Sequence, residues 1–178
     1  MIFENQPTLP VRIRPFHGEA TIGYLLRVSQ ANGYVTLSQL VNPFRSFDAL
    51  CQGLNLSIEE RQTLIGPLSS FRGSTELLNS QTSVDFNTSL MRWCSLCFQE
   101  SAHIRGSWLL KISCVCSRHA VVLHDRCPCC GSVQRLGRVN YLQCDCGVCN
   151  GQQKPDTCLG SVSRKFPLEF DRGLIAQC

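Results

Sequence analysis

The second half of the chain contains cysteine and histidine residues at the spacing of two metal sites. Each site combines two short ligand pairs, and the tight turn within a pair directs both side chains at one ion. The first set is Cys94, Cys97, Cys116 and His119, and the second set is Cys127, Cys130 and Cys146 with either Cys144 or Cys149. Four such ligands fill the tetrahedral coordination of zinc, whereas a catalytic zinc keeps one position open for water. The spacing therefore predicts two structural zinc ions per chain.

The thirteen cysteines of the chain could instead form the disulfides of a secreted protein. Two features favour zinc. Residues 1–7 lack the basic start and the apolar stretch of a signal peptide, and the cysteines occur in Cys-x2-Cys pairs together with a Cys-x2-His, which is a zinc spacing. The sequence also has no apolar run of about 18 residues, so it predicts no membrane-spanning segment and no membrane partner.

The net charge of the chain argues against tight nucleic-acid binding by charge alone. The formal charge is +4. Seven zinc-bound thiolates would add seven negative charges and two zinc ions would add four positive ones, which leaves about +1. Each phosphate contact needs a cation. The composition therefore does not predict a strongly basic nucleic-acid-binding protein.

Residues 1–68 have the pattern of a helical module that includes an extended, proline-bracketed segment. Apolar residues recur at helical spacing between Gly18 and Asn32, and two later segments, 36–39 and 57–60, match capping boxes. Four short helices joined by tight turns fit a helix-turn-helix-like module. The same pattern fits other small helical domains, so it does not by itself indicate DNA binding.

The rest of the chain divides into a connector, a metal-binding region and a tail. Residues 69–89 are rich in Ser, Thr, Asn and Gln and are predicted to be the connector. Residues 90–149 are predicted to form two tandem zinc-finger or zinc-ribbon modules, with a strand-like pattern at 108–112 and 121–123. Residues 150–178 follow as a C-terminal tail. The predicted fold class is small α+β, with a helical module followed by two zinc modules.

Several motifs, taken together, resemble the TniQ family. Residues 9–34 are similar to the start of that family, with a proline-bracketed basic stretch, a Gly-Glu pair and a helix that ends in Ala-Asn-Gly-Tyr. The second half adds Trp93-Cys94-x2-Cys97, Trp108, Cys116-Ser-Arg-His119 and Asp125-Arg-Cys127-Pro-x-Cys130-Gly131. The resemblance extends over residues 9–149. The short chain is more similar to the small TniQ proteins of CRISPR-associated transposons than to the longer, TnsD-like members.

This resemblance implies a non-catalytic adaptor in target-site selection for a Tn7-like transposon. Such proteins link a targeting complex, for example an RNA-guided CRISPR effector, to a TnsC-like AAA+ ATPase on DNA. The resemblance also implies a bacterial cytoplasmic, nucleoid-associated location and allows contact with DNA or RNA within the assembly. The alternative function is that of a stand-alone, sequence-specific DNA-binding protein of the TnsD type.

An enzyme is a third class, and the sequence argues against it. His17-Gly-Glu19 has the His-x-Glu of zinc nucleobase deaminases, which also need Pro-Cys-x-x-Cys. Pro128-Cys129 lacks the second cysteine of that motif. The chain also has no Gly-x4-Gly-Lys-Ser/Thr loop for binding phosphate, so any ATPase activity must belong to a partner.

The resemblance and the charge pattern indicate the remaining candidate site residues. Many relatives carry Cys-x-Cys-Gly at the end of the second site, which favours Cys144 and Cys146. Cys149, at the standard spacing from Cys146, stays the alternative to Cys144. The candidate partner-binding residues are Arg12, Arg14, Arg135, Arg138 and Tyr141. For the arginines, ordinary solvent-exposed charge is the competing explanation.

Overall fold

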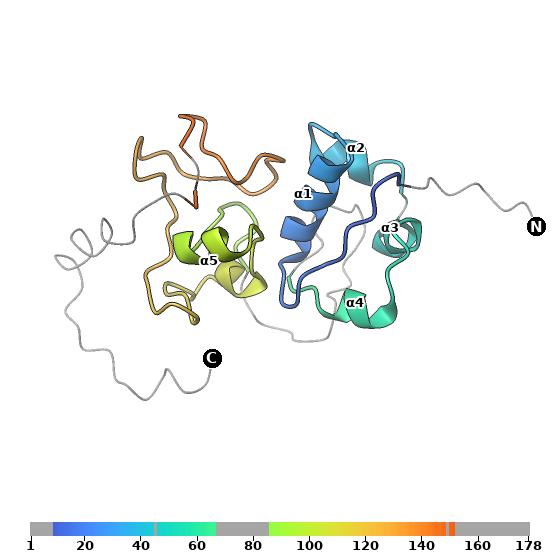
Figure 1. Ribbon diagram of the computed structural model, residues 1–178, viewed down its shortest axis with the longest axis horizontal. Helices are drawn as coiled ribbons and strands as arrows, with labels where there is room; N and C mark the ends of the chain where they lie inside the picture. Colours follow the sequence, from blue (N-terminus) through green and yellow to red (C-terminus); the bar gives the residue numbers. More distant parts are fainter. Residues whose placement is uncertain (1–8, 45, 67–85, 149, 152–178) are drawn as a thin grey trace, which may run out of the picture.

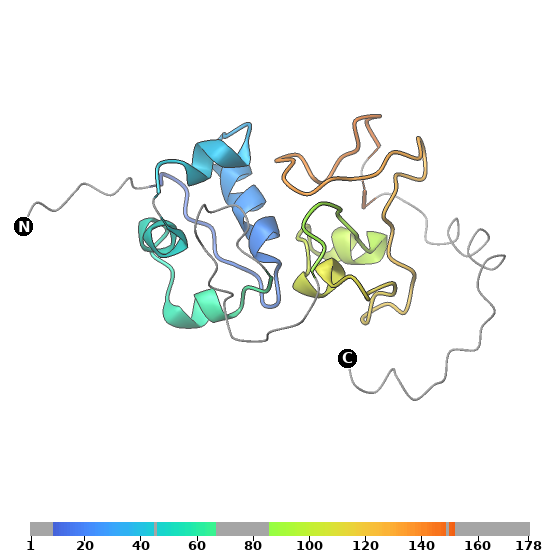
Figure 2. The ribbon, with the colours of Figure 1, turned by 180° about the vertical axis from the view of Figure 1, so that it is seen from behind.

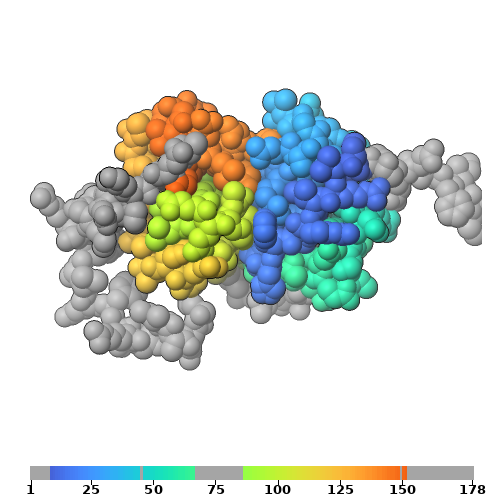
Figure 3. All heavy atoms as spheres, viewed as in Figure 1, coloured from blue at the N-terminus to red at the C-terminus, as the bar shows by residue number. Residues whose placement is uncertain are grey.

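The computed structural model describes residues 9–44, 46–66, 86–148 and 150–151. These residues form a helical lobe and a cysteine-rich lobe that lie side by side (Figure 1). The space-filling view shows that the two lobes touch along one edge (Figure 3). Most of the predicted connector and nearly all of the predicted tail lie outside the described residues.

Short helices supply most of the regular structure in both lobes. The helical lobe contains four α-helices: α1 (Thr21–Ala31), α2 (Leu37–Val41), α3 (Phe47–Gly53) and α4 (Ile58–Gln62). The cysteine-rich lobe contains α5, Ser95–Glu100, and the 3-10 helix Gly106–Leu109. Backbone pairing between segments of the described chain takes the form of isolated bridges. No helix in the described part of the chain has the length and apolar character needed to cross a membrane.

The helices of the first lobe begin and end close to the predicted residues. At α4 the Glu60 backbone N–H donates to Ser57 Oγ at 3.2 Å, and the Ser57 backbone N–H donates to the Glu60 carboxylate at 2.8 Å. These two bonds are the predicted capping box. After α1 the chain turns at Gly33, whose φ of +74° favours glycine. Helix α1 itself begins at Thr21, slightly later than predicted, because the Glu19 backbone pairs with the cysteine-rich lobe.

The predicted strand at 108–112 is wrong. Trp108 and Leu109 belong to the 3-10 helix, and each is 2% exposed. Successive side chains of a strand point to opposite faces, whereas these two neighbours both pack in the core. Residues 121–123 pair with the rest of the lobe through a bridge between Val122 and Val115. The helix-turn-helix-like assignment of the first lobe stays a prediction.

The extended segment that begins at Leu9 runs along α1 and is fastened to it by side chains of that helix and its C-cap. The Asn32 side chain accepts from the Val11 backbone N–H and donates to the Val11 carbonyl, both at 2.9 Å. The Tyr24 hydroxyl donates to the Ile13 carbonyl at 3.0 Å. These bonds satisfy backbone groups of Val11 and Ile13, in a segment that forms no β-bridge with the described part of the chain.

Glu19 is a fully buried carboxylate just before α1. Arg27, about two turns along the helix, donates to both carboxylate oxygens at 2.7 and 2.8 Å. The Phe16 backbone N–H donates to one of them at 3.0 Å, and the Arg27 guanidinium lies 4.3 Å from the centroid of the Phe16 ring. Burial raises the pKa of Glu19, while the hydrogen bonds and charge of Arg27 act in the opposite direction. The pair thus joins the N-terminal segment to α1.

The helical lobe has a hydrophobic core of its own, and part of α1 also packs into the core of the cysteine-rich lobe. Ala20, at the start of α1, is buried in the same cluster as Trp93 and Trp108. Its backbone N–H donates to the Ile104 carbonyl at 2.8 Å. A Cβ added to Gly23 would lie 2.8 Å from Ile104 Cβ, so α1 approaches the cysteine-rich lobe as closely as a glycine permits. The lobes therefore form one continuous packed body.

Replacing Glu19 with alanine should lower the free energy of unfolding by about 3 kcal/mol, because the substitution leaves the largely buried Arg27 charge without its partner. The matched control is Asp48→Ala. Asp48 pairs with Arg61, but its side chain is 72% exposed, so its loss should cost less than about 1 kcal/mol. Urea unfolding followed by tryptophan fluorescence measures both variants. Equal destabilisation would contradict the importance of the buried pair.

Candidate metal centres

Cys94, Cys97, Cys116 and His119 converge on one point in the cysteine-rich lobe. Their donor atoms all lie within 4.8 Å of one another. Cys97 Sγ is 3.6 Å from Cys116 Sγ and 3.2 Å from His119 Nδ1. Ligands about 2.3 Å from a central zinc ion lie about 3.8 Å apart at the tetrahedral angle. The size and donor set of this first cluster therefore fit a four-coordinate ion, and the cluster could bind zinc.

Helix α5 and a tight turn position these four ligands. Cys94 is the N-cap of α5 and Cys97 lies in its first turn, so the start of the helix directs both sulfurs to one side. In the turn, the Ala120 backbone N–H donates to the Cys116 carbonyl at 2.8 Å, and Ala120 has a φ of 53°. The three cysteines of the cluster are at most 1% exposed. The first cluster is therefore shielded from solvent by the shared core.

The orientation of His119 is set from outside the cluster by Glu100. His119 presents Nδ1 to the sulfurs, and its Nε2 lies 3.0 Å from Glu100 Oε1. Glu100 also pairs with Arg118 at 3.0 Å. A carboxylate that accepts from the second imidazole nitrogen fixes the tautomer and makes the first nitrogen a better metal ligand. The sequence analysis missed Glu100, although its position three residues after Cys97 on one helix was a usable signal.

The thiols of the first cluster have opposite pKa shifts. Burial, followed by interactions with the neighbouring cysteines, raises the pKa of Cys97 to about 12. Burial also opposes ionisation of Cys116, but the backbone N–H groups of His119 and Arg118 outweigh it and lower that pKa to about 7. Because a zinc ion binds the thiolate form, Cys116 is the cysteine of this cluster best prepared to ionise first.

Cys127, Cys130, Cys144 and Cys146 form a second cluster, whose four sulfurs also lie within 4.8 Å of one another. Cys127 Sγ lies 3.6 Å from Cys146 Sγ, and Cys130 Sγ lies 3.5 Å from Cys144 Sγ. These separations again suit a tetrahedral ion of zinc size. Cys149 lies outside the described residues. The structure thus brings together the set that the resemblance favoured.

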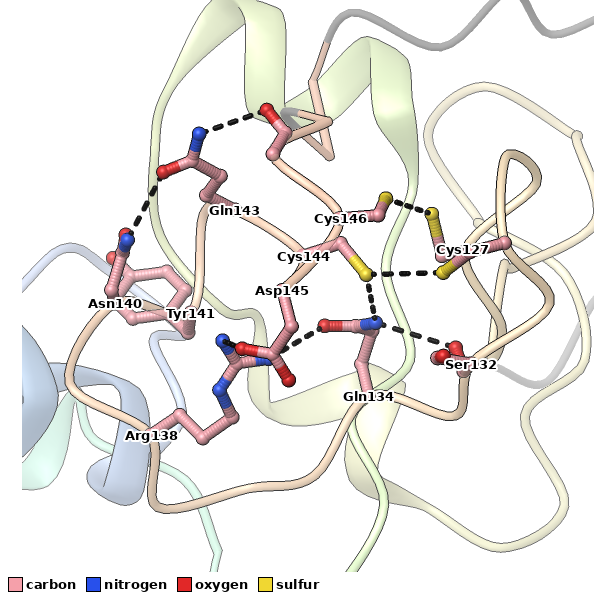
Figure 4. Close-up of polar contacts among 12 residues, drawn as sticks. Cys127, Ser132, Gln134, Arg138, Asn140, Tyr141, Gln143, Cys144, Asp145 and Cys146 are labelled. Atoms are coloured by element: carbon pink, nitrogen blue, oxygen red, sulfur yellow. Dashed lines mark hydrogen bonds and ion pairs between the residues drawn. The ribbon is translucent and has the colours of Figure 1, made fainter.

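Gln134 is a polar neighbour of the second cluster that the sequence did not reveal. It is 2% exposed, and its Nε2 donates to Cys144 Sγ at 3.2 Å and to the Ser132 carbonyl at 3.3 Å (Figure 4). A hydrogen-bond donor aimed at sulfur stabilises the thiolate form, which is the form that binds metal. Hydrogen bonds from the Ser132 side chain and backbone likewise lower the pKa of Cys130 to about 6.

The two candidate partner contacts on the N-terminal segment differ in their surroundings. Arg12 is exposed, and its Nε donates to the Leu9 carbonyl at 3.4 Å. Arg14 is engaged within the helical lobe, where Nη1 donates to the Glu60 carboxylate at 2.9 Å and to the Asn55 carbonyl at 2.8 Å. Arg14 therefore contributes to the fold. A substitution of Arg12 tests a partner contact with less disturbance of contacts inside the lobe.

In the loop between the cysteine pairs of the second cluster, the structure contradicts the prediction that Tyr141 contacts a partner. Tyr141 is 2% exposed and its hydroxyl donates to the Ala102 carbonyl at 2.7 Å. Its ring therefore belongs to the shared core and is not available to a partner. Arg138 forms an ion pair with Asp145 (Figure 4), whereas Arg135 is exposed. Arg135 stays a candidate partner contact.

Removal of metal should unfold more than the cysteine-rich lobe. We expect two zinc ions per chain, and structural zinc contributes about 10 kcal/mol or more in small modules. Because Ala20 and Trp108 share a core, a chelator should also loosen α1. Elemental analysis measures the zinc content, and hydrogen exchange with and without chelator measures the protection of α1. Fewer than two zinc ions per chain, or unchanged protection of α1, would contradict this expectation.

Replacing Glu100 with alanine should weaken zinc binding at the first cluster about tenfold or more, because His119 loses the carboxylate that orients it. The matched control is Arg118→Ala, which removes the other partner of Glu100 and leaves its contact with His119 in place. Competition with a chromogenic chelator measures the affinity. If both variants bound zinc equally well, Glu100 would have no role in the metal site.

Comparison with known families adds an independent observation. The model of the TniQ family matches residues 10–123, which is well over half of the chain. The matched region contains the helical lobe and the first cluster, and it ends before the second cluster. A comparison with curated proteins gave no match. The family match confirms the resemblance that the sequence motifs indicated.

Proposed function

Since the chain belongs to the TniQ family, we propose that it is a non-catalytic adaptor in target-site selection during DNA transposition. Membership in the family makes it a transposition-associated protein. In this proposal the chain links a targeting complex, such as an RNA-guided CRISPR effector, to a TnsC-like AAA+ ATPase assembled on DNA. The transposon is of the Tn7-like type, and the chain acts in the bacterial cytoplasm on the nucleoid.

The observation that carries the proposal is that the family match runs through both lobes. The matched residues, 10–123, include α1, the buried pair of Glu19 and Arg27, and the first cluster. Ala20 and Leu26, at and in α1, are buried in the same cluster as the cysteines of the first metal site. A pre-organised body loses little conformational entropy when it binds, and it holds its surfaces at a fixed spacing. Both properties suit a protein that bridges two partners.

The metal clusters support a structural role for zinc. Each cluster supplies four protein ligands, so an ion held there has no open position for a water molecule or a substrate. What zinc would supply here is a crosslink between segments that are distant in sequence. The residues around it then serve to orient the ligands, as Glu100 does for His119.

Exposed apolar side chains occur on both lobes, whose solvent-exposed parts are called here the helical surface and the cysteine-rich surface. On the helical lobe, Val35 in the turn before α2 is 79% exposed and Ile58 in α4 is 68% exposed. On the cysteine-rich lobe, Ile112 is 79% exposed and Val115 is 52% exposed. We assign the helical surface, together with Arg12, to the ATPase. The cysteine-rich surface then contacts a further ATPase subunit or the targeting complex. Because one chain carries both surfaces, the first contact raises the effective concentration for the second.

The second candidate function is a stand-alone DNA-binding protein, in which the helical lobe acts as a helix-turn-helix-like module. The order of four short helices, α1 to α4, is compatible with it. With two zinc ions bound, the net charge of about +1 leaves few cations for phosphate contacts, so we rank the adaptor first. Sequence-specific binding to DNA at physiological salt, without the ATPase, would reverse this order.

Reversing the charge of Arg12 with Arg12→Glu should weaken recruitment of the TnsC-like ATPase to DNA about tenfold, which corresponds to about 1.4 kcal/mol. The reason is that an exposed cation at an interface attracts an acidic partner surface, and a carboxylate repels it. The matched control is Arg12→Lys, which keeps the charge and should recruit normally. Co-sedimentation of the ATPase with DNA measures recruitment, and zinc analysis verifies the fold.

Two outcomes would contradict different parts of the proposal. If the unmodified chain had no effect on ATPase assembly on DNA, the adaptor function itself would be wrong. If Arg12→Glu and Arg12→Lys both recruited the ATPase normally, the assignment of the helical surface to the ATPase would be wrong. An equivalent test with Arg135→Glu and Arg135→Lys then examines the cysteine-rich lobe.

A further inference from the structure

The two clusters differ in how far solvent reaches their cysteines. Cys94, Cys97 and Cys116 of the first cluster are at most 1% exposed. In the second cluster Cys130 and Cys146 are exposed. A thiolate must be reached by an oxidant before it can react, so oxidation selects accessible thiolates. The structure therefore offers one protected cluster and one accessible cluster in the same lobe.

Each exposed cysteine of the second cluster lies beside a buried one. Cys146 Sγ is 3.6 Å from Cys127 Sγ, and Cys130 Sγ is 3.5 Å from Cys144 Sγ. Cys127 is 1% exposed and Cys144 is 3% exposed. A disulfide bond is about 2.05 Å long, so either pair needs to approach by about 1.5 Å. A sensor thiol needs such a second thiol nearby to trap its oxidised form.

We propose that the second cluster is a site of reversible oxidation by peroxide that releases its zinc ion. The inference rests on the proposed zinc occupancy of this cluster and goes beyond the adaptor function. The oxidant is hydrogen peroxide or an organic peroxide, which is small enough to reach an exposed thiolate. The first cluster, whose cysteines are buried, keeps its ion under the same conditions.

The reaction has two balanced steps. The exposed thiolate of Cys146 or Cys130 attacks one peroxide oxygen, so that an S–O bond forms, the O–O bond breaks and hydroxide leaves, which gives a sulfenic acid. The neighbouring thiolate of Cys127 or Cys144 then attacks the oxidised sulfur, so that an S–S bond forms and hydroxide leaves. Two thiolates lose two electrons and one hydrogen peroxide gains them. Zinc loses two of its four ligands and dissociates, and a dithiol reduces the disulfide again.

Oxidation of this cluster would act on the contact between the lobes. The loop between its cysteine pairs reaches toward α1 and α2 in both views (Figures 1 and 2). In that loop the backbone of Arg138 forms an isolated β-bridge with Thr36, just before α2. Release of the metal would weaken this contact between the lobes. The predicted consequence is a change in the surface formed jointly by the two lobes.

The test uses the full-length, zinc-loaded protein with a chromogenic zinc chelator and a titration of hydrogen peroxide. Peroxide should release one of the two zinc ions, and the remaining ion should leave at least about tenfold more slowly because its thiolates are buried. Peptide mass spectrometry should find a disulfide between Cys127 and Cys146 or between Cys130 and Cys144. Addition of dithiothreitol and zinc should restore two ions per chain.

Cysteines outside the clusters provide the matched controls. Cys114 and Cys129 are exposed and belong to neither cluster, so a Cys114→Ser, Cys129→Ser variant should release one zinc ion as the unmodified protein does. A Cys130→Ser, Cys146→Ser variant should hold one zinc ion that resists peroxide. If that variant fails to fold, the order of zinc release and the disulfide map of the unmodified protein still show whether the second cluster is the site of oxidation.

Three outcomes would overturn the inference. The first is release of both zinc ions at the same rate. The second is loss of peroxide sensitivity in the Cys114→Ser, Cys129→Ser variant, which would place the reactive thiol outside the cluster. The third is zinc release without either expected disulfide. The adaptor function is tested separately by recruitment of the ATPase under reducing conditions, so failure of one proposal can be distinguished from failure of the other.

Discussion

In the cysteine-rich lobe, the convergence of sulfur and imidazole groups on one point would let a metal ion supply the long-range connections that a hydrogen-bonded sheet provides in other domains. The described part of this lobe has one short α-helix, one 3-10 helix and isolated backbone bridges. Such elements cannot fix the chain alone, since short helices are marginal without tertiary contacts. Two pairs of ligands brought to one point join α5 to the turn that carries His119, and Trp108 packs against Phe98 within the same core. The positions of the aromatic side chains thus depend on the ligands.

Helix α1 of the helical lobe also packs into that core. Ala20 and Leu26 of the helical lobe are buried with Trp93, and the absence of a side chain on Gly23 permits the close approach to Ile104. A metal ion in the cysteine-rich lobe would therefore stabilise α1 as well, although α1 supplies no ligand. This coupling is the physical basis for treating both lobes as one body in the proposed adaptor function, rather than as two independent domains.

The two clusters differ more in the residues and solvent around their candidate ligands than in the ligands themselves. The first cluster combines buried sulfurs with a carboxylate behind its histidine, contributed by Glu100. The second cluster has the donor of Gln134 on one sulfur and solvent on two of its cysteines. Burial protects thiolates from oxidants and exposure does not. Two sites with similar coordination geometry can therefore differ in lability for reasons that lie outside the ligand set.

The sequence by itself determined the features that depend on near neighbours. The capping box of Ser57 and Glu60 and the turn at Gly33 follow from the identity of near neighbours, and the structure contains them. The spacing of the cysteine pairs likewise predicted two groups of candidate ligands, and the structure brings two such groups together. The choice of Cys144 over Cys149 came from the family resemblance, and the structure describes Cys144 within the cluster.

Tertiary structure decided what depends on residues distant in sequence. A strand-like pattern at Trp108 became a 3-10 helix because both Trp108 and Leu109 are buried in the shared core. Tyr141 resembled an exposed loop aromatic until the fold placed its hydroxyl against the Ala102 carbonyl. The burial of Glu19 and the exposure of Cys146 likewise depend on which segments cover them. Periodicity and spacing carry information along the chain, whereas burial is a property of the segments that meet in space.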